Sequence, residues 1–205
     1  MWVVKLGGSL QNSEYLQRWL DTLTGRFAGK AMIVAGGGKY ADAVREQQRV
    51  EGLDDCDAHR LALMATEDFA KEMQGLCPAL QLVDEMDELS HCLLAGKVPV
   101  WLPARELAGK DGIPSSWEFT SDSVAAWLAL QIQAESLFLV KSVGLENHSP
   151  DLRSLSELGF VDSGMQKLSG ISTLPIYWVE RSQTQQFFDF HLSSTAQQLP
   201  RVSLN

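Results

Sequence analysis

Three turns in the sequence place glycine beside lysine or serine directly after an apolar run. They are Lys5-Leu6-Gly7-Gly8-Ser9, Ala35-Gly36-Gly37-Gly38-Lys39 and Lys141-Ser142-Val143-Gly144. Where a strand ends in glycines and a helix follows, bare backbone N–H groups can approach a phosphate, and the positive end of the helix dipole adds to the attraction. The residues therefore indicate the binding of a phosphate-bearing ligand.

The same glycines also have a purely structural interpretation. Glycine after a strand often does no more than permit a tight turn with positive φ. The Walker A pattern is incomplete because Tyr40 follows Gly38-Lys39 and an earlier glycine is lacking. The dinucleotide pattern GxGxxG is incomplete because Ala41 stands where the third glycine belongs. No single turn identifies a function.

Apolar runs alternate with amphipathic stretches along the chain. The runs predict strands at 2–6, 31–35, 80–83, 98–102, 136–140 and 174–179. Helical spacing of apolar residues predicts helices at 12–27, 40–50, 57–74, 85–95 and 122–133. Ser13 is the expected N-cap of the first helix, and Thr120 or Ser121 that of the last. Residues 103–121 read as a loop, and about the last fifteen residues are polar enough to fray. This alternation implies an α/β fold with a largely parallel sheet, whose ligands bind beyond the carboxyl ends of the strands.

Composition sets limits on the partners. A chain of 205 residues, 45% hydrophobic and 21% charged, fits one domain with a sizeable core. The net charge of −9 and the dispersed Lys and Arg argue against nucleic acid or an anionic membrane as a partner. A few basic groups can still form a local site for a small anion. No apolar run reaches the roughly 18 residues of a membrane span, and no signal peptide is visible, so we expect a cytoplasmic protein.

Cysteines and histidines show no ligand spacing. The three cysteines form no CxxC pair and fit a reducing compartment, and the four histidines match no metal-binding pattern. These residues are Cys56, Cys77, Cys92, His59, His91, His148 and His191. We therefore expect no metal site built from protein side chains.

Four motifs follow one another along the chain. They are VVKLGGS at 3–9, IVAGGG at 33–38, TSDSVAA at 120–126 and VKSVG at 140–144. In this order they resemble the amino acid kinase family, which includes acetylglutamate, aspartate, uridylate and isopentenyl phosphate kinases. The resemblance implies a three-layer αβα sandwich with a mostly parallel central sheet. It further implies one domain over 1–205, with an acceptor side at about 1–120 and a shortened nucleotide side at about 121–205. ATP, Mg²⁺, a small anionic metabolite as acceptor and a homo-oligomer follow from the same resemblance.

The resemblance also assigns roles to single residues. Lys5 would lie along the transferred phosphoryl group, and Asp122 would orient lysines without acting as a base. The residues expected around the nucleotide are Gly7, Gly8, Ser9, Lys141, Gly144 and, as a second lysine near the phosphates, Lys167. The residues expected on the acceptor side are Gly36, Gly37, Gly38 and Thr120, with Gly8 and Gly37 nearest the phosphoryl group in flight.

These roles agree with the physics of phosphoryl transfer. Its loose transition state is stabilised mainly by positioning and by neutralising charge on the equatorial oxygens. A buried carboxylate between two lysines keeps both charged. The structural alternatives are a solvent-facing strand end for Lys5, a helix cap for Asp122 and a surface position for Lys167.

Three stretches of the sequence narrow the range of possible acceptors. They are residues 36–45, 101–105 and 116–123. These stretches resemble a small branch of short kinases from archaea and methylotrophic bacteria, whose archaeal members phosphorylate an aminomethylfuran-methanol phosphate during methanofuran synthesis. The resemblance implies a phosphate-to-diphosphate step in the same or a related one-carbon cofactor pathway. Arg45 would pair with the acceptor phosphate, Trp117 or Trp101 would cover the ring, and Glu118 or Asp42 would meet the ammonium. The alternatives are a core position for Trp101 and a helix-surface ion pair for Arg45.

Two other functions stay open. A carboxylate kinase would form an acyl phosphate, although the longer acceptor-side hairpin usual in such kinases is not obvious here. A non-catalytic nucleotide-sensing protein could share the fold, although the retention of Lys5 and Asp122 argues against it. The apolar run at 187–190 is either a subunit contact or a helix packed on the core.

Overall fold

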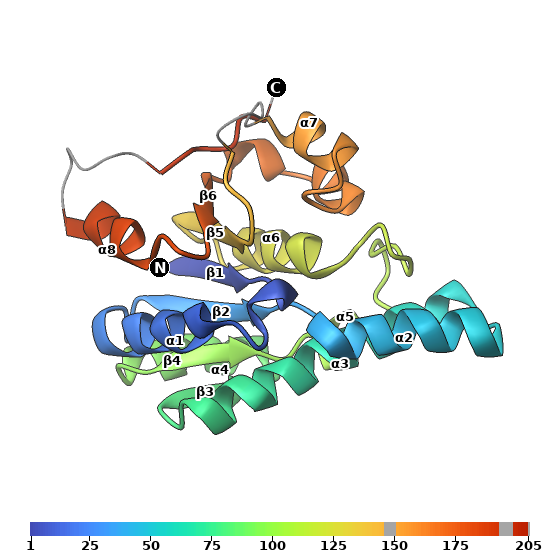
Figure 1. Ribbon diagram of the computed structural model, residues 1–205, viewed down its shortest axis with the longest axis horizontal. Coiled ribbons are helices and arrows are strands. Elements are labelled where there is room, and N and C mark those ends of the chain that lie inside the picture. The colour runs from blue at the N-terminus through green and yellow to red at the C-terminus, as the bar shows by residue number, and fades with distance from the viewer. Residues whose placement is uncertain (146–150, 193–198, 205) are drawn as a thin grey trace.

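Six parallel strands form the central sheet of the computed structural model, which describes residues 1–145, 151–192 and 199–204 (Figure 1). The strands are β1 (Trp2–Leu6), β2 (Ala31–Ala35), β3 (Leu80–Val83), β4 (Val98–Trp101), β5 (Ser136–Lys141) and β6 (Ile176–Glu180). Their order in the sheet is β3-β4-β2-β1-β5-β6, and each pair runs parallel. The parallel α/β sheet expected from the sequence is confirmed.

Helices cover both faces of this sheet. The longer ones are α1 (Glu14–Arg26), α2 (Gly38–Glu51), α3 (Asp55–Leu76), α4 (Met86–Leu94), α6 (Ser121–Gln131) and α8 (Thr184–Leu192). Trp19 of α1, Phe69 of α3 and Phe187 of α8 pack with Val4 of β1 on one face. Residues of α4 and α6 pack with Val3 on the other face, because successive strand residues point to opposite sides. The three-layer αβα sandwich is confirmed.

Capping and glycine residues define the starts of helices α1 and α2. Ser13 caps α1 as expected, since its Oγ accepts a hydrogen bond from Tyr15 N–H at 3.2 Å. Helix α2 begins at Gly38, within the triple glycine and two residues earlier than expected. Gly38 has φ of +51°, a left-handed conformation that favours glycine. The second glycine turn is therefore also the start of a helix.

Parts of the chain differ from the expectation. The expected loop at 103–121 contains the single turn α5 (Ala104–Leu107), whose first N–H donates to Glu67 Oε1 at 2.9 Å. Between β5 and β6 lie α7 (Leu152–Glu157) and the 3₁₀ turns η2 (Ser163–Lys167) and η3 (Ile171–Thr173), while a further 3₁₀ turn, η1 (Gly8–Leu10), follows β1. These elements are too short for apolar periodicity to reveal them.

The end of the chain was expected to fray, and this is wrong for residues 199–204. Trp178 N–H donates to Pro200 O at 2.9 Å, and Val202 N–H donates to Ile176 O at 2.8 Å, so this segment pairs with β6. Val202 is buried against the core. Residues 193–198 and 205, which belong to the same expectation, lie outside the described residues. Phe187 is fully buried, which favours core packing for the aromatic run.

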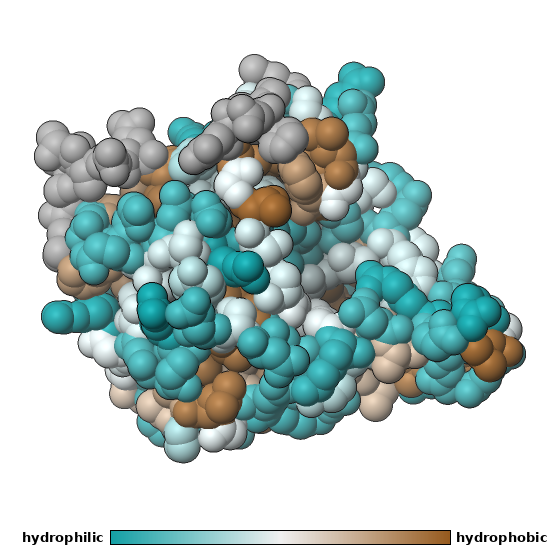
Figure 2. Space-filling model, viewed as in Figure 1, coloured by the Kyte–Doolittle hydropathy of each residue, from teal (hydrophilic) through white to brown (hydrophobic). Residues whose placement is uncertain are grey.

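The hairpin of α2 and α3 extends past the carboxyl ends of the strands, at the right of Figure 1. Gly52, in the left-handed conformation, ends α2, and Asp54 caps α3 by accepting from Asp57 N–H. Mostly hydrophilic side chains cover the hairpin in Figure 2. It stands beside the edge of the sheet where the glycine turns lie. In the described residues, no helix combines the length and the apolar character needed to cross a membrane.

Candidate active site

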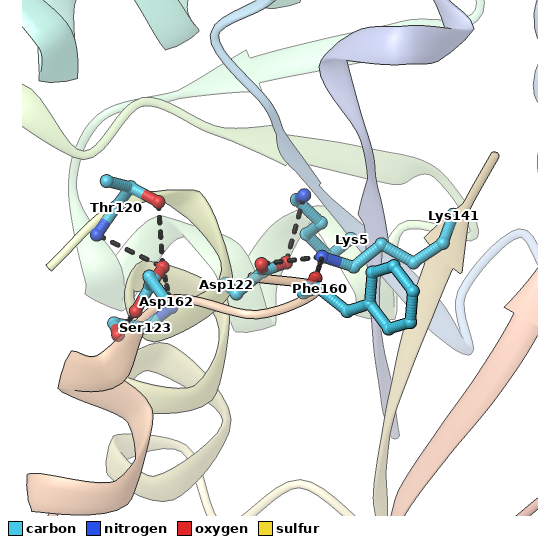
Figure 3. A network of polar contacts seen from close by, with 7 residues as sticks. All are labelled: Lys5, Thr120, Asp122, Ser123, Lys141, Phe160 and Asp162. Atoms are coloured by element: carbon cyan, nitrogen blue, oxygen red, sulfur yellow. Dashed lines mark hydrogen bonds and ion pairs between the residues drawn. The ribbon is translucent and has the colours of Figure 1, made fainter. Parts of the chain in front are cut away.

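Two lysines and one aspartate meet near the carboxyl edge of the sheet (Figure 3). Lys5 Nζ lies 2.9 Å from Asp122 Oδ1, and Lys141 Nζ lies 2.6 Å from Asp122 Oδ2. The side chains of Lys5, Lys141 and Asp122 are only 6%, 13% and 8% exposed. Lys141 Nζ also donates to Phe160 O at 2.6 Å. One buried carboxylate therefore holds two ammonium groups, which leaves a local positive charge.

Strand register explains why these residues meet. β1 and β5 are neighbours, and Lys5 is paired with Leu139. Lys141 comes two residues later and therefore points to the same face as Lys5. Helix α6 covers that face, and Asp122 lies in its first turn. Three distant parts of the sequence thus converge without strain.

The two lysines govern the ionisation of the aspartate. Burial alone would raise the pKa of Asp122, but the charges of Lys141 and Lys5 outweigh it and lower the pKa to about 2. Burial lowers the pKa of Lys141 to about 8, although Asp122 acts to raise it. Asp122 is therefore ionised at neutral pH, and Lys141 keeps its proton because the carboxylate is beside it.

Lys5 keeps donors available. Lys5 Nζ lies 2.9 Å from the buried Asp122 Oδ1 and compensates its charge. An ammonium carries three N–H donors. A Cβ placed on Gly7 would lie 3.7 Å from Lys5 Nζ, so the ammonium lies directly beside the first glycine turn. It can donate to an anion bound there.

The first two glycine turns touch each other. A Cβ on Gly8 would lie 2.3 Å from Gly38 N, and a Cβ on Gly36 would lie 2.4 Å from Gly8 N. Gly36 N–H is committed to Leu6 O and Gly7 N–H to Val140 O. In the described chain, the N–H groups of Gly8, Gly37 and Gly38 reach no backbone acceptor. These amides, rather than that of Gly7, are free to bind phosphate oxygens.

A cavity of about 430 Å³ opens beside these turns. Its walls come from η1, the start of α2, the α2-facing side of α3 and the segment before α6. Of the residues expected to bind ligands, those lining it are Gly8, Ser9, Gly37, Gly38, Asp42, Arg45, Trp117 and Thr120. The structure therefore brings residues of both glycine turns and several of the expected acceptor residues around one space.

Arg45 and Trp117 form the outer part of this cavity. The Arg45 guanidinium lies 4.3 Å from the centre of the Trp117 ring, and its Nη1 lies 2.9 Å from Asp42 Oδ1. Trp117 Nε1 donates to Gln48 Oε1 at 2.7 Å. Arg45 is about half exposed, so the helix-surface ion pair and the cavity position hold together.

Other expected residues lie elsewhere. Trp101 is fully buried and stacks on Trp127 with ring centres 5.9 Å apart, so the hypothesis that it covers a ligand ring is wrong. Lys167 is about half exposed and pairs with Glu118 at 2.6 Å. Gly144 follows β5, and a Cβ there would lie 3.1 Å from Glu180 Oε2. Neither Lys167 nor Gly144 lines the cavity.

Asp162, which sequence reasoning missed, fixes the start of α6. Its carboxylate accepts hydrogen bonds from Thr120 N–H and Oγ and from Ser123 N–H and Oγ (Figure 3). Thr120 is the N-cap residue, as expected, but its side chain makes no capping bond, and Asp162 satisfies the helix start instead. Burial raises the pKa of Asp162, and the charge of Asp122 raises it further. Helix α6 holds Asp122, so Asp162 supports the lysine cluster indirectly.

A second missed group joins the two glycine turns. Gln11 Oε1 accepts from Lys39 N–H at 2.8 Å, and Gln11 Nε2 donates to Glu72 at 2.6 Å. Lys39 Nζ and Tyr40 OH reach the same Glu72 oxygen at 3.2 and 3.0 Å. Burial would raise the pKa of Glu72, but these hydrogen bonds lower it. The position of Lys39, directly after the triple glycine, was the one signal that could have revealed this group.

Among the described residues, no group of three or more His, Cys, Asp or Glu is placed to hold a metal ion. His148 lies outside the described residues, as does the side chain of His191. His59 is buried and lines the cavity. The cysteines with described positions are free thiols.

Comparisons with known proteins agree with this arrangement. A model of the amino acid kinase family matches residues 1–160. The chain is similar to (5-(aminomethyl)furan-3-yl)methyl phosphate kinase of Methanocaldococcus jannaschii, with 25% identity over 144 residues, which span 70% of this chain and 66% of that protein. The structure is similar to uridylate kinase from Archaeoglobus fulgidus, with a TM-score of 0.66 and 20% identity over 92% of this chain and 95% of that one. It is also similar to isopentenyl phosphate kinase of T. acidophilum, with a TM-score of 0.60 and 13% identity over 97% and 99% of the two chains. At these identities the structural likeness shows the fold alone.

Proposed function

Because the chain belongs to the amino acid kinase family, we propose that it is an ATP-dependent kinase that phosphorylates a small phosphate monoester. The observation that carries this proposal is Asp122 held between buried Lys5 and Lys141, beside free backbone amides and an open cavity. Phosphoryl transfer needs positive charge and N–H donors fixed around the equatorial oxygens. The described residues supply both.

Each part of the site has a proposed task. Lys5 and Lys141 neutralise the transferred group, and Asp122 fixes their positions. The amides of Gly8 and Gly37 would bind oxygens of the transferred phosphoryl group, and Ser9 would add a hydroxyl on the nucleotide side. Mg²⁺ would be held mainly by the phosphates of ATP, because this ion keeps most of its waters and needs few protein ligands.

Lys141 is the better placed second lysine. Its Nζ lies 2.6 Å from Asp122, whereas Lys167 is paired with Glu118 near the surface. A role for Lys167 at the nucleotide phosphates stays a prediction. So do a contact of Gly144 with the nucleotide, the division into an acceptor side and a shortened nucleotide side, and the homo-oligomer.

The acceptor is proposed to be an aminomethylfuran-methanol phosphate or a close relative, in one-carbon cofactor biosynthesis of the methanofuran type. The curated archaeal relative acts on such a compound by its name. In this chain, Arg45 would pair with the phosphate monoester and Trp117 would cover the flat ring. Asp42 lines the cavity but is paired with Arg45, and Glu118 faces Lys167, so a contact of either carboxylate with the ammonium stays a prediction.

An ATP-consumption assay with Mg²⁺ tests the proposal. The purified protein is offered phosphate and carboxylate acceptors, including the aminomethylfuran-methanol phosphate, and Lys5→Ala serves as the catalytic control. Turnover with a phosphate monoester that is lost in Lys5→Ala supports the kinase and its acceptor class. Turnover with a carboxylate alone would show an acyl-phosphate-forming kinase. ATP binding without turnover on any acceptor would show a nucleotide-sensing protein.

A further inference from the structure

The inner wall of the cavity is formed by five buried residues from α3, from the segment entering α6 and from α6 itself. They are His59, Leu63, Thr66, Phe119 and Val124. Three of them have apolar side chains, so a ligand group that reaches this wall meets polar side-chain atoms of the wall only at His59 and Thr66. The hydrogen-bonding capacity of these two residues therefore decides which group fits there.

His59 presents a hydrogen-bond acceptor. Its Nε2 lies 3.2 Å from Phe119 O, and a carbonyl oxygen can only accept, so Nε2 carries the proton. Burial lowers the pKa of His59, which favours this neutral form. Nδ1 bonds to no described residue, yet it is not among the fully buried polar atoms that lack a partner. It therefore opens toward the cavity that His59 lines.

Thr66 presents a second acceptor. Its hydroxyl donates to Leu63 O at 2.7 Å, which uses the only proton of that group. The oxygen keeps its lone pairs and lies on a residue that is 6% exposed. The side chains of His59 and Thr66 thus both donate their only proton to a backbone carbonyl. The wall can accept hydrogen bonds and cannot donate them.

We propose that the inner wall recognises a donor-bearing substituent of the acceptor, a primary amine or a hydroxyl, through His59 Nδ1 and Thr66 Oγ. A fully ionised phosphate has no donor to offer and is bound at the glycine turns and the outer part of the cavity. A methyl group at the same position leaves two buried acceptors without partners. This inference rests on the proposed kinase function and specifies its substrate class.

Discrimination between matched acceptors tests the inference. Three furan-methanol phosphates are compared, which carry an aminomethyl, a hydroxymethyl or a methyl group at the same ring position. Sites built to bind a donor reject analogues that lack it by several orders of magnitude, so we expect kcat/KM for the better donor to exceed that for methyl by at least about 100-fold. The amino and hydroxyl compounds show which donor the wall takes.

Two variants assign this preference to the wall. His59→Phe and Thr66→Val should each lower the donor-to-methyl ratio by about 10-fold or more, while the rate on the methyl compound changes little. His91→Gln, at an exposed position on α4, should leave the ratio unchanged. An unchanged ratio in both wall variants, or equal use of all three acceptors by the unaltered protein, would overturn the inference.

A binding measurement separates this inference from the proposed function. In ¹⁵N NMR spectra of the intact protein, His59 should show a protonated Nε2 and a bare Nδ1. The Nδ1 signal should shift with the unphosphorylated aminomethyl or hydroxymethyl furan-methanol and not with the methyl compound. If no acceptor is turned over but this selective shift occurs, the kinase proposal fails and the donor site stands. A proton on Nδ1 in the free protein would refute the donor site even if turnover is observed.

Discussion

Replacing Asp122 with asparagine tests the electrostatic centre of the site. The change keeps the size of the side chain but leaves Lys5 and Lys141, both buried, without a negative partner. Removing one partner of a buried ion pair costs about 3–5 kcal/mol, and here one carboxylate serves two cations. We therefore expect the free energy of unfolding near neutral pH to fall by at least about 3 kcal/mol.

The loss should depend on pH in a defined direction. The pKa of Lys141 is about 8 with Asp122 present, and loss of the carboxylate must lower it further. The folded variant then releases this proton at a lower pH than the unaltered protein does, while the unfolded chain retains it up to its ordinary pKa of 10.5. Stability rises with pH wherever the unfolded state binds more protons. The deficit of Asp122→Asn should therefore shrink as the pH rises from about 6 to about 8.

Urea unfolding followed by tryptophan fluorescence provides the measurement. Asp111→Asn, at an exposed position, makes the same charge change and is the matched control. The double variant Asp122→Asn with Lys141→Met removes one stranded cation and should recover part of the lost stability. The reasoning is refuted if Asp122→Asn loses less than about 1 kcal/mol relative to the control, or if its deficit is the same at each pH.

Three further outcomes are expected. Lys5→Met should reduce the rate of ATP consumption with the acceptor by about 10²–10³-fold, while the KM for the acceptor changes little. The reason is that the ammonium stabilises charge that develops in the transition state. A variant whose main change is a higher KM would contradict this. Gly8→Ala would place a Cβ 2.3 Å from Gly38 N and should cost about 1–3 kcal/mol in urea unfolding. Its control, Gly25→Ala in open space within α1, should instead add about 0.5–1 kcal/mol. In pH–rate profiles, kcat/KM should fall above a pH of about 8 as Lys141 loses its proton; a flat alkaline limb would exclude Lys141 from the reaction.

Much of the fold could be predicted because buried parallel strands give short apolar runs that end abruptly. Trp2–Leu6 and Ala31–Ala35 stop at glycines, and both were expected with their observed bounds. The order of the strands could not be read from these runs, since an apolar run carries no mark of its neighbour. The segment between β5 and β6 has only short turns, so neither periodicity nor capping signals revealed it.

The residues of the candidate site could be predicted from the sequence, but the contacts between them could not. The glycine turns stood out by residue type and by their position after strands, and the family resemblance singled out Lys5 and Asp122. Lys141 was assigned to the nucleotide loop, and Lys167 was considered for the second lysine. Once β1 and β5 are neighbours, the pairing of Lys5 with Leu139 places Lys141 beside Lys5 on the α6 face. The missing information was therefore strand order, from which the lysine pair follows.

Asp162 and the inner wall of the cavity show a different limit. Asp162 accepts hydrogen bonds from Thr120 and Ser123, which lie about forty positions earlier in the sequence. It stands directly before a 3₁₀ turn, an element too short to be predicted from a sequence pattern. His59 resembles any other residue on the buried side of a long amphipathic helix. Its distinction is the hydrogen bond to Phe119 O, which depends on how the segment before α6 passes α3. Such contacts are properties of tertiary packing alone.

The ionisation of Asp122 restricts the class of acceptor that the site can use. A general base works best when its pKa lies near the working pH. The two lysines instead lower the pKa of Asp122 to about 2, and they contact both of its carboxylate oxygens. Under the proposed function, an attacking oxygen that is already ionised needs no proton acceptor from Asp122. A phosphate monoester, with its second pKa near 6, meets this condition at neutral pH, and a carboxylate does so as well. An alcohol would need a proton acceptor other than Asp122, so under the proposed function the lysine cluster favours acid anions as acceptors.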